Sequence, residues 1–416
     1  MLKNLTAWIG LAIVLGVPAG LLSAAHPDLS WLFAWTHIFG DVFVAALKML
    51  LVPVILTSLL VGVTSVGDIS KMGRLGGRAT GYYLLTTAIA IFIGLILVNV
   101  IQPGVGADLG TAQMTEQAQA GMGLTPDTLI RDFLVDKNRG AIRNPFQALA
   151  EGNVLGIILF TLLLGTALVA IGEAGQPVIA IVKGLDKAVM RVVDWVLWLA
   201  PLGVFALLHK SLADGGFAAV KALAAYSATV TLALAIHGFV ALPLLVRFLG
   251  RMSPRAWLRG IRAPMAVAFS TASSSATLPV TIEACEENLD VPGPVASFVL
   301  PLGATMNMDG TALYEAVAAL FVAQAYGIDL SLGQQLVVFF TAAAASVGAA
   351  GIPSAGLVTM AMVFQAVGLP LEGIGLILAV DRFLDMFRTT VNVMGDTSAA
   401  VILKRFAPSG PAPVTP

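Results

Sequence analysis

The chain has 416 residues, of which 58% are hydrophobic and only 11% are charged, and its mean hydropathy is +0.91. The surface of a soluble globular protein needs more charge than this, so the composition indicates an integral membrane protein. The formal net charge is −1 and no block of Lys and Arg dominates, which argues against nucleic acid as a partner.

Cysteine and histidine give no sign of a disulfide framework or a structural metal. Cys285 is the single cysteine, and the chain contains no CxxC or HExxH spacing. The four histidines are scattered singly, and we interpret them as interface or packing residues rather than ligands. They are His26, His37, His209 and His237.

Six ordinary apolar segments, each about 20 residues or longer and so able to cross the hydrocarbon core, precede residue 258. They lie near 6–24, 38–66, 80–102, 152–172, 190–209 and 219–246. The first has a basic start and a small-residue end like a signal peptide, but its length favours an uncleaved first span. Two further helices of spanning length are predicted near 294–325 and 372–403.

Two segments between these helices are interrupted by small residues. Residues 263–284 and 341–364 each contain two arms of about 10 to 14 apolar residues around a centre rich in Ser, Gly, Ala and Pro. Arms of this length are too short to cross separately, so each pair is predicted to form a re-entrant helical hairpin. Paired interruptions of this kind indicate a transporter's binding site at the membrane midplane. The alternative is two kinked ordinary spans.

Basic residues predict the orientation of the chain. They gather at Lys3, around 71–78, at 183–191, at 247–262 and at Lys404–Arg405, which all fall on one side if the N-terminus is cytoplasmic. Residues 103–145 are then an external loop. Residues 173–191 carry Lys and Arg at helical spacing, which is typical of an amphipathic helix at the cytoplasmic surface; a partner-binding helix is the alternative.

The last predicted helix has one polar stripe. Six polar residues fall within an arc of roughly 100° on a helical wheel, opposite an apolar face. They are Asp381, Asp385, Arg388, Thr389, Asn392 and Asp396. Since an ionised group at the bilayer centre costs about 2.5 to 3.5 kcal/mol on insertion scales, the stripe is expected to line a cavity or to pair internally. An Asp385–Arg388 salt bridge is the structural alternative.

A second polar cluster, "NMDGTALY" at 307–314, interrupts the preceding long helix. Asn, Asp and Gly in mid-span predict local unwinding that frees backbone carbonyls, which together with carboxylates suit a hard cation such as Na⁺. The alternative is a Gly kink at which Asn307 and Asp309 only cap the broken ends.

The tips of the two predicted hairpins also carry chemistry. "STASSSATLP" at 270–279 offers serine hydroxyls and backbone N–H groups to a carboxylate, and "AAGIPSAG" at 349–356 offers small residues that let backbone approach a ligand. An intramembrane hydrolase using Ser273 to Ser275 is a weaker alternative, because the segment lacks GxSxG. A passive anion channel is the other.

Taken in order, these motifs resemble the dicarboxylate/amino acid:cation symporter family. The resemblance also includes "LKMLLVPVILTSLLVGV" (47–63), "GYYLLTT" (81–87) and "RNPFQAL" (143–149), and so covers nearly the whole chain. It implies an all-α polytopic membrane protein with eight transmembrane helices, two re-entrant hairpins, and scaffold and transport domains. Residues 1–257 would be mainly scaffold, with spans three and six joining the transport domain, 258–404 the transport core, and 405–416 a disordered tail.

The resemblance implies that the protein is not an enzyme but a homotrimeric symporter, lying in lipid in a bacterial or archaeal inner membrane with both termini cytoplasmic. It would import L-aspartate or L-glutamate with Na⁺ by an elevator-type mechanism. Arg388 would bind the side-chain carboxylate of the substrate and Asp385 its amino group. The remaining substrate contacts would come from Thr389, Asn392, Thr311, Ser274, Ser275, Ile352 and Gly356.

The family's sodium sites are carried over in the same way. The first would contain Asp396, Asn392 and the backbone of Gly303 and Asn307. The second would contain Tyr83, Thr86, Thr87, Asn307 and Asp309, and the third the carbonyls of Thr305, Ser346, Val347 and Ala349. Because the side chains of the second site are all present, Na⁺ coupling is preferred to H⁺ coupling.

The chain also departs from the family pattern. Many members carry a second arginine near the substrate, where this chain has Ala272 or Met386. Arg388 argues against a neutral substrate, because an unpaired buried guanidinium is costly. Asp385 favours an amino acid over a C4-dicarboxylate such as succinate. A C4-dicarboxylate is therefore the alternative substrate, and H⁺ is the alternative coupling ion.

Overall fold

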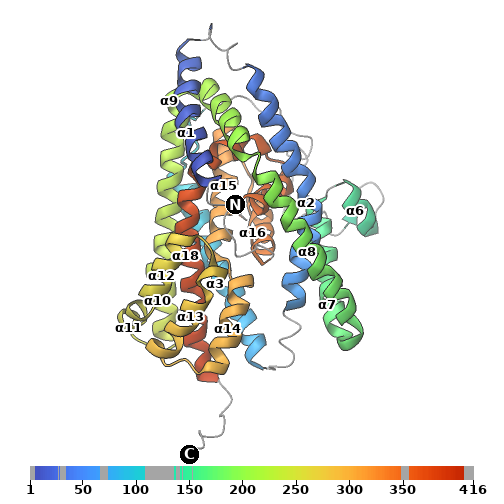
Figure 1. Ribbon diagram of the computed structural model, residues 1–416, viewed down its shortest axis with the longest axis vertical. Helices are drawn as coiled ribbons and strands as arrows, with labels where there is room; N and C mark the ends of the chain where they lie inside the picture. Colours follow the sequence, from blue (N-terminus) through green and yellow to red (C-terminus); the bar gives the residue numbers. More distant parts are fainter. Residues whose placement is uncertain are drawn as a thin grey trace, which may run out of the picture.

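The computed structural model describes residues 5–26, 28, 34–65, 74–107, 135–136, 141–142, 144–151, 153–347 and 356–406. This described part is an elongated bundle of helices (Figure 1), which confirms the predicted helical class. It also contains one small antiparallel ribbon, in which β1 (Val135–Asp136) pairs with β2 (Ala141–Ile142). The ribbon lies within 103–145, the predicted external loop, most of which is outside the described residues.

The helices before residue 172 agree with the first four predicted spans. Helix α1 packs along α9, and α2 packs against α7, α8 and α9. Asn153 caps α7, accepting a hydrogen bond from the N–H of Gly156 at 2.8 Å. The elements are α1 (Leu5–Ala25), η3 (Ala34–Thr36), α2 (His37–Ser65), α3 (Arg74–Ile101), α6 (Pro145–Glu151) and α7 (Val154–Ala170).

The predicted start of the fifth span at 190 is wrong, whereas the predicted division between the fifth and sixth spans agrees with a break at Gly216. After the 3-10 turn η5 (Gly172–Gly175), a single helix, α8 (Gln176–Leu197), contains the amphipathic stretch and enters the predicted fifth span. Helix α9 (Ala200–Ile236) begins at a proline, which has no N–H to continue the preceding helix. It then continues into the predicted sixth span. The helix is broken at Gly216, whose φ of 55° is a conformation that glycine adopts more readily than other residues.

Helix α8 is amphipathic as predicted, but it packs along α2, and Ser58 donates a hydrogen bond to Asp186 at 2.8 Å. Beyond α9 the chain forms a π-helix, η6 (His237–Ala241), and then α10 (Leu242–Phe248) and α11 (Pro254–Gly260). A π-helix is rare and is found mostly at functional sites.

Both interrupted segments form pairs of short helices. In the first, α12 (Arg262–Thr271) packs against α13 (Ser274–Leu289). In the second, α16 (Leu332–Val347) packs against α17 (Gly356–Ala366), and residues 348–355 of its tip lie outside the described part. Both pairs also contact α18 or α15, which carry the polar clusters.

The long helix predicted at 294–325 is broken in the middle, as the polar cluster indicated. It consists of α14 (Gly293–Met306) and α15 (Asp309–Ala325), separated by the non-helical Asn307 and Met308. The chain then continues through η7 (Leu371–Gly373), α18 (Ile374–Leu403) and η8 (Lys404–Phe406).

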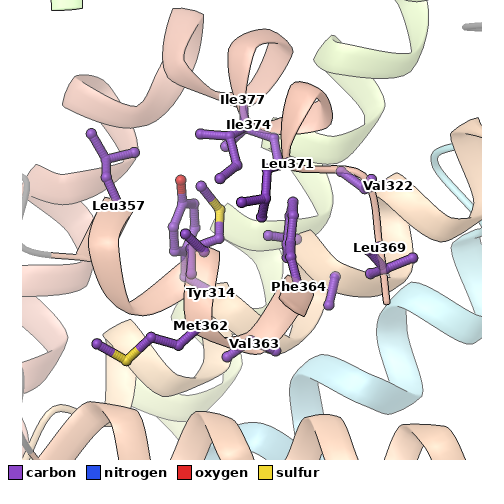
Figure 2. Close-up of a cluster of buried hydrophobic side chains, with 14 of the residues drawn as sticks. Tyr314, Val322, Leu357, Met362, Val363, Phe364, Leu369, Leu371, Ile374 and Ile377 are labelled. Atoms are coloured by element: carbon purple, nitrogen blue, oxygen red, sulfur yellow. The ribbon is translucent and has the colours of Figure 1, made fainter. Parts of the chain in front are cut away.

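Helix α15 lies at the centre of the main hydrophobic core. It is apolar nearly all round and is enclosed by α3, α9, α16, α17 and α18, as a fully buried helix requires. Figure 2 shows part of this packing, with Tyr314 of α15, Phe364 of α17 and Ile374 of α18 among the labelled side chains. A second core joins α3, α11, α13, α14 and the end of α18. The break between α14 and α15 lies where these two cores meet.

The outer surface is that of a multi-pass membrane protein. Large apolar side chains are widely exposed, for example Val14 at 66%, Phe92 at 61% and Phe217 at 74%. Within the described residues, four helical stretches are long and apolar enough to cross a membrane. They are Ala7–Ala25, His37–Thr64, Leu75–Ile101 and Ala200–Phe248.

Three of the five basic segments that were predicted to share one membrane face, those near Arg78, Leu249 and Arg405, meet at one end of the bundle, where Figure 1 shows α11 and the end of α18. Arg405 donates to the carbonyl of Leu249 at 2.6 Å, and Arg78 stacks over Phe406 at 4.1 Å. Arg405 and Phe406 were predicted to begin a disordered tail, but they form a packed turn instead. Residues 407–416 of that tail lie outside the described part.

Candidate functional site: an arginine and two carboxylates beside a broken helix

The break between α14 and α15 is stabilised from another helix. Gly310 donates its backbone N–H to Oδ1 of Asn392 on α18 at 2.8 Å, which satisfies one of the N–H groups that a helix start leaves without a partner. A Cβ on Gly310 would lie 2.6 Å from the carbonyl oxygen of Arg388, so only glycine allows this approach. The side chains of Asn307 and Asp309 point away from the break to other partners, and the alternative in which they only cap it is therefore wrong.

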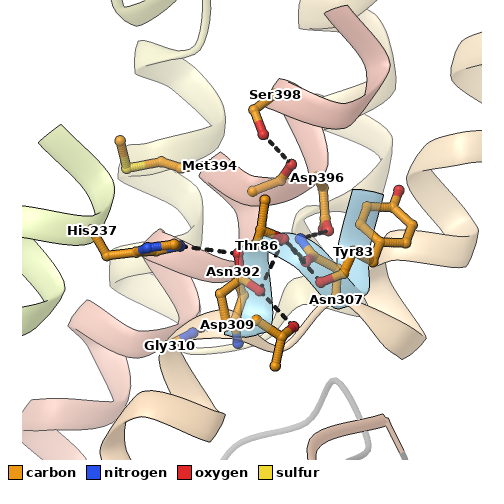
Figure 3. Close-up of polar contacts among 12 residues, drawn as sticks. Tyr83, Thr86, His237, Asn307, Asp309, Gly310, Asn392, Met394, Asp396 and Ser398 are labelled. Atoms are coloured by element: carbon orange, nitrogen blue, oxygen red, sulfur yellow. Dashed lines mark hydrogen bonds and ion pairs between the residues drawn. The ribbon is translucent and has the colours of Figure 1, made fainter. Parts of the chain in front are cut away.

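Asp309 is contacted by polar side chains from two other elements, α3 and η6 (Figure 3). Its Oδ1 accepts hydrogen bonds from Thr86 at 3.2 Å and Thr87 at 2.8 Å, both on α3. Its Oδ2 lies 3.0 Å from Nε2 of His237 on η6. Thr86 also reaches Oδ1 of Asn307 at 3.3 Å. The structure thus brings together four of the five residues of the second predicted sodium site, and adds a histidine that was interpreted as a packing residue.

Asp396 is the second buried carboxylate. Its Oδ1 accepts a hydrogen bond from Nδ2 of Asn307 at 2.9 Å, so Asn307 connects the two acidic groups. A Cβ on Gly303 would overlap the Asp396 carboxylate and would lie 2.8 Å from the hydroxyl of Tyr83. Tyr83 donates that hydroxyl to the carbonyl of Val299 at 2.8 Å and lies beside Asp396 (Figure 3). The first and second predicted sodium sites are therefore neighbours.

The charge of these two carboxylates is not balanced by a nearby basic side chain. Asp309 and Asp396 are 0% and 2% exposed, and in the described part of the chain neither pairs with Lys or Arg. A buried carboxylate is costly unless it is paired or coordinates a cation. The hydroxyl, amide and carboxylate oxygens gathered here are ligands that a hard cation accepts.

Arg388 is held on one side of its guanidinium. Its Nη2 lies 2.8 Å from Oδ1 of Asp385 and 3.0 Å from Oδ1 of Asp381, and its Cζ stacks over the ring of Tyr314 at 3.9 Å. The hydroxyl of Tyr314 donates to Asp381 at 2.8 Å. The Asp385–Arg388 salt bridge that the sequence allowed is therefore present.

On the other side of the guanidinium, two N–H donors have no hydrogen-bond partner among the described residues. Nε and Nη1 of Arg388 are buried and make no hydrogen bond to any described residue. Nη1 lies 2.8 Å from the position that a Cβ on Gly356 would take, which places it at the start of α17. Since an unsatisfied buried donor costs about 1 to 3 kcal/mol, these donors are suited to binding an anion.

The structure gives contacts for some of the remaining predicted substrate residues and not for others. Asn392 lies 3.4 Å from Oγ1 of Thr311, and Thr389 is buried on α18 beside Arg388. At the tip between α12 and α13, Ser274 is buried and Ser275 is exposed. Their contacts with substrate stay a prediction, and Ile352 lies outside the described residues.

Ser273 has a local structural role. Its Oγ accepts a hydrogen bond from the N–H of Ala276 at 3.2 Å and so caps α13, after Ala272 has ended α12 in a left-handed conformation with φ 49°. The first N–H groups of α13 therefore lie at a helix N-terminus, which favours anions.

The third predicted sodium site is not tested by the described part of the chain, because its ligands would be backbone carbonyls and one of its residues, Ala349, is not described. Ser346 donates to the carbonyl of Ala343 at 2.9 Å, Thr305 bonds back to Leu302 at 2.9 Å, and Ala349 lies outside the described residues. The carbonyl oxygen of Val347 lies 2.7 Å from the position of a Cβ on Gly62 of α2. This site stays a prediction.

Sequence reasoning missed the roles of His237, Asp381 and Glu315. Asp381 was placed on the polar stripe without a partner, and the structure pairs it with Arg388 and Tyr314. Glu315 is fully buried on α15, with Thr359 and Arg388 as polar neighbours. A glutamate within an apolar helix is itself a signal of function, because ionisable residues at membrane depth are rare.

Comparisons with known proteins identify the family of the chain. The model of the sodium:dicarboxylate symporter family matches residues 5–406. Human excitatory amino acid transporter 3 is 37% identical, over 95% of this chain and 84% of its own length. The proton/sodium-glutamate symport protein of Geobacillus stearothermophilus is 34% identical, over 96% of this chain and 94% of its own length. An excitatory amino acid transporter of Caenorhabditis elegans is 38% identical, over 88% of this chain and 80% of its own length. The chain therefore belongs to the sodium:dicarboxylate symporter family.

Proposed function

We propose that this protein is a secondary active symporter that moves an acidic amino acid, L-aspartate or L-glutamate, across a membrane together with Na⁺. One observation carries the proposal: two donors of the buried Arg388 have no partner among the described residues, while two buried carboxylates, Asp309 and Asp396, lie beside the broken helix. The first feature suits an anionic side chain and the second suits a cation. The names of the relatives, which specify glutamate, sodium and protons, support the same assignment.

We propose the following residue roles, which the geometry supports. Nε and Nη1 of Arg388 would bind the substrate's side-chain carboxylate, and Asp385, which already pairs with Nη2, would bind its ammonium group. Asn392 and Thr311 would contribute amide and hydroxyl contacts from α18 and α15. Sodium ions would bind at Asp396 with Asn307, and at Asp309 with Thr86 and Thr87.

Coupling has a physical basis in the same helix. Arg388 and Asp396 lie two turns apart on α18, and Asn392 lies between them and caps α15. A cation at Asp396 or Asp309 offsets their buried negative charge and orders the break, which supports the position of Asn392 next to the substrate. Substrate and ion therefore stabilise one arrangement together, which is positive coupling between two sites.

We further propose the membrane arrangement that the sequence indicated. The chain would have eight spans, with α12–α13 and α16–α17 as re-entrant hairpins, and would form a homotrimer with cytoplasmic termini in a bacterial or archaeal membrane. The transport core, 258–404, would move against a scaffold formed by the first 257 residues. Support comes from the short paired helices and from the basic segments that meet at one end of the bundle.

A proton is a second candidate coupling ion. Glu315 is 0% exposed one turn from Thr311 on the same helix, and Arg388 is a neighbouring charge. A carboxyl group placed so deeply is accommodated more easily when it is neutral, so a proton on Glu315 could travel with the substrate. Uptake that increases with an inward H⁺ gradient in wild-type protein but not in Glu315→Gln would support this addition to Na⁺ coupling.

Calorimetric titration of purified protein tests the substrate class. L-aspartate, L-glutamate, L-serine and succinate would each be titrated with and without Na⁺. We expect binding of an acidic amino acid that requires Na⁺, and no binding of L-serine. Under a dicarboxylate function, Asp385→Ala would spare succinate, because succinate has no ammonium group. If no amino acid binds in any condition, the proposal fails.

A further inference from the structure

The interaction between His237 and Asp309 connects a π-helix to a carboxylate at the broken helix. Both side chains are fully buried, and Nε2 of His237 lies 3.0 Å from Oδ2 of Asp309 (Figure 3). No other described residue hydrogen-bonds this oxygen; the other partners of Asp309 bind Oδ1. The two carboxylate oxygens therefore have separate environments.

The tautomer of His237 follows from its surroundings. A carboxylate oxygen can only accept, so Nε2 carries the proton and donates it to Asp309. Nδ1 is buried and has no hydrogen-bond partner in the described part of the chain. In a neutral imidazole Nδ1 is then a bare acceptor, and a proton there would be a buried donor with nowhere to donate. Of the two neutral tautomers, the geometry thus favours the one with the proton on Nε2.

The two carboxylate oxygens of Asp309 have partners of different kinds: hydroxyl groups contact Oδ1, and an imidazole ring contacts Oδ2. The hydroxyl groups of Thr86 and Thr87 donate to Oδ1, but a hydroxyl can rotate and turn a lone pair toward a cation. The N–H of an imidazole ring is fixed in the ring plane and can only donate, so it cannot turn a lone pair toward a cation. A cation can therefore take over the Oδ1 side while the Oδ2 side keeps its hydrogen bond.

The backbone explains how His237 reaches this position. The π-helix His237–Ala241 interrupts the α-helical register at the histidine itself. Next to it, a Cβ on Gly238 would lie 3.4 Å from Sδ of Met394 and 3.4 Å from Val391, so this segment is already in close contact with α18. His237 is thus placed against Asp309 by an irregular backbone and by tight packing.

We propose that His237 is a positioning residue for sodium: by holding Oδ2 of Asp309, it fixes the orientation in which Oδ1, Thr86 and Thr87 receive the ion. This inference rests on the proposed function, because it assumes that Asp309 binds Na⁺. The expected consequence of removing the donor is weaker sodium binding with little change in the substrate affinity measured at saturating Na⁺.

Two substitutions of similar volume separate positioning from packing. His237→Met fills the space without an N–H, and His237→Gln keeps a donor at a comparable reach. His209→Met is the matched control, because His209 is also a buried histidine of the α9 region, but its Nε2 bonds Ser23 at 3.0 Å, far along the chain from the ion site. All three variants and the wild-type chain would be purified in detergent as full-length protein.

The measurement is the thermal unfolding midpoint as a function of NaCl, with choline chloride keeping ionic strength constant. We expect the half-saturating Na⁺ concentration to rise at least tenfold in His237→Met, and to stay within about threefold of wild type in His237→Gln and His209→Met. Aspartate titration at saturating Na⁺ should give dissociation constants within about threefold of each other for all variants.

The outcomes distinguish the two proposals. If His237→Met responds to Na⁺ like wild type, or if His237→Gln is as defective as His237→Met, His237 does not position the ion site and this inference is overturned. If the wild-type protein itself shows no Na⁺-dependent stabilisation, the proposed sodium coupling fails instead.

Discussion

Asn392 of α18 accepts a hydrogen bond from the backbone N–H of Gly310 in α15 at 2.8 Å. A side chain one turn from Arg388 therefore caps the helix that begins with Asp309. The Asn392 amide therefore links the helix of Arg388, the proposed substrate residue, to the break at the proposed ion site, and most of the proposed mechanism depends on this connection.

Asn392→Ala tests the connection. The substitution removes the acceptor for Gly310 and the contact with Thr311, so we expect a loss of about 1 kcal/mol of stability, typical of a lost helix cap. Aspartate and Na⁺ should both bind more weakly, which denaturation midpoints and calorimetry would measure. A variant with weaker aspartate binding but unchanged Na⁺ affinity would show that the cap does not couple the two sites.

Arg388→Lys tests the role of the guanidinium. A lysine ammonium can pair with Asp385 but cannot present the two further donors, Nε and Nη1, in a planar fork. Since hydrogen bonds to charged groups contribute about 1.5 to 3 kcal/mol each, we expect aspartate affinity to fall by about 100-fold or more. Arg382→Lys is the control, because Arg382 is partly exposed and lies 3.7 Å from Asp385. Equal affinity in both variants would contradict the assigned role.

Asp396→Asn tests the charge at the ion site. Asp396 is buried and has no basic partner among the described residues, so its removal should raise the stability of the protein without Na⁺, because the cost of burying the charge disappears. The same change should abolish much of the Na⁺-dependent stabilisation, which is about 2.7 kcal/mol at a hundred times the dissociation constant. Thermal unfolding with NaCl and with choline chloride measures both effects. Lower stability in choline and an unchanged response to Na⁺ would exclude Asp396 as an ion ligand.

Gly303→Ala tests the close approach of α14 to the Asp396 carboxylate. The new methyl group would overlap that carboxylate and crowd the Tyr83 hydroxyl, both of which are fixed by packing. We expect a folded protein that responds poorly to Na⁺. Gly81→Ala on α3 is the control, since a Cβ there meets nothing within 4 Å, and it should bind Na⁺ normally. A normal Na⁺ response in Gly303→Ala would mean that the ion does not bind between Gly303 and Asp396.

Much of the fold could be predicted from local patterns. The interruption at "NMDG" predicted the break between α14 and α15, because Asn, Asp and Gly have low helix propensities. The helical wheel placed Arg388, Asn392 and Asp396 on one face of α18, and the structure buries all three. Short apolar arms around small residues predicted the α12–α13 and α16–α17 pairs.

The rest depends on contacts between distant segments. The division between α8 and α9 was missed because Pro201 starts a helix within a continuous apolar run, where periodicity gives no boundary. His237 was interpreted as a packing residue because the four histidines are scattered singly in the sequence, and its link to Asp309 spans 72 positions. The pairing of Asp381 with Tyr314 likewise joins two helices whose registers the sequence does not relate.

Coupled uptake into proteoliposomes tests the central proposal most directly. Purified protein would be reconstituted, and labelled L-aspartate uptake measured with an inward Na⁺ gradient, with an inward H⁺ gradient without Na⁺, and with neither. We predict accumulation against the aspartate gradient only when Na⁺ is present, and none in Arg388→Lys. Undiminished uptake under the H⁺ gradient without Na⁺ would contradict the account.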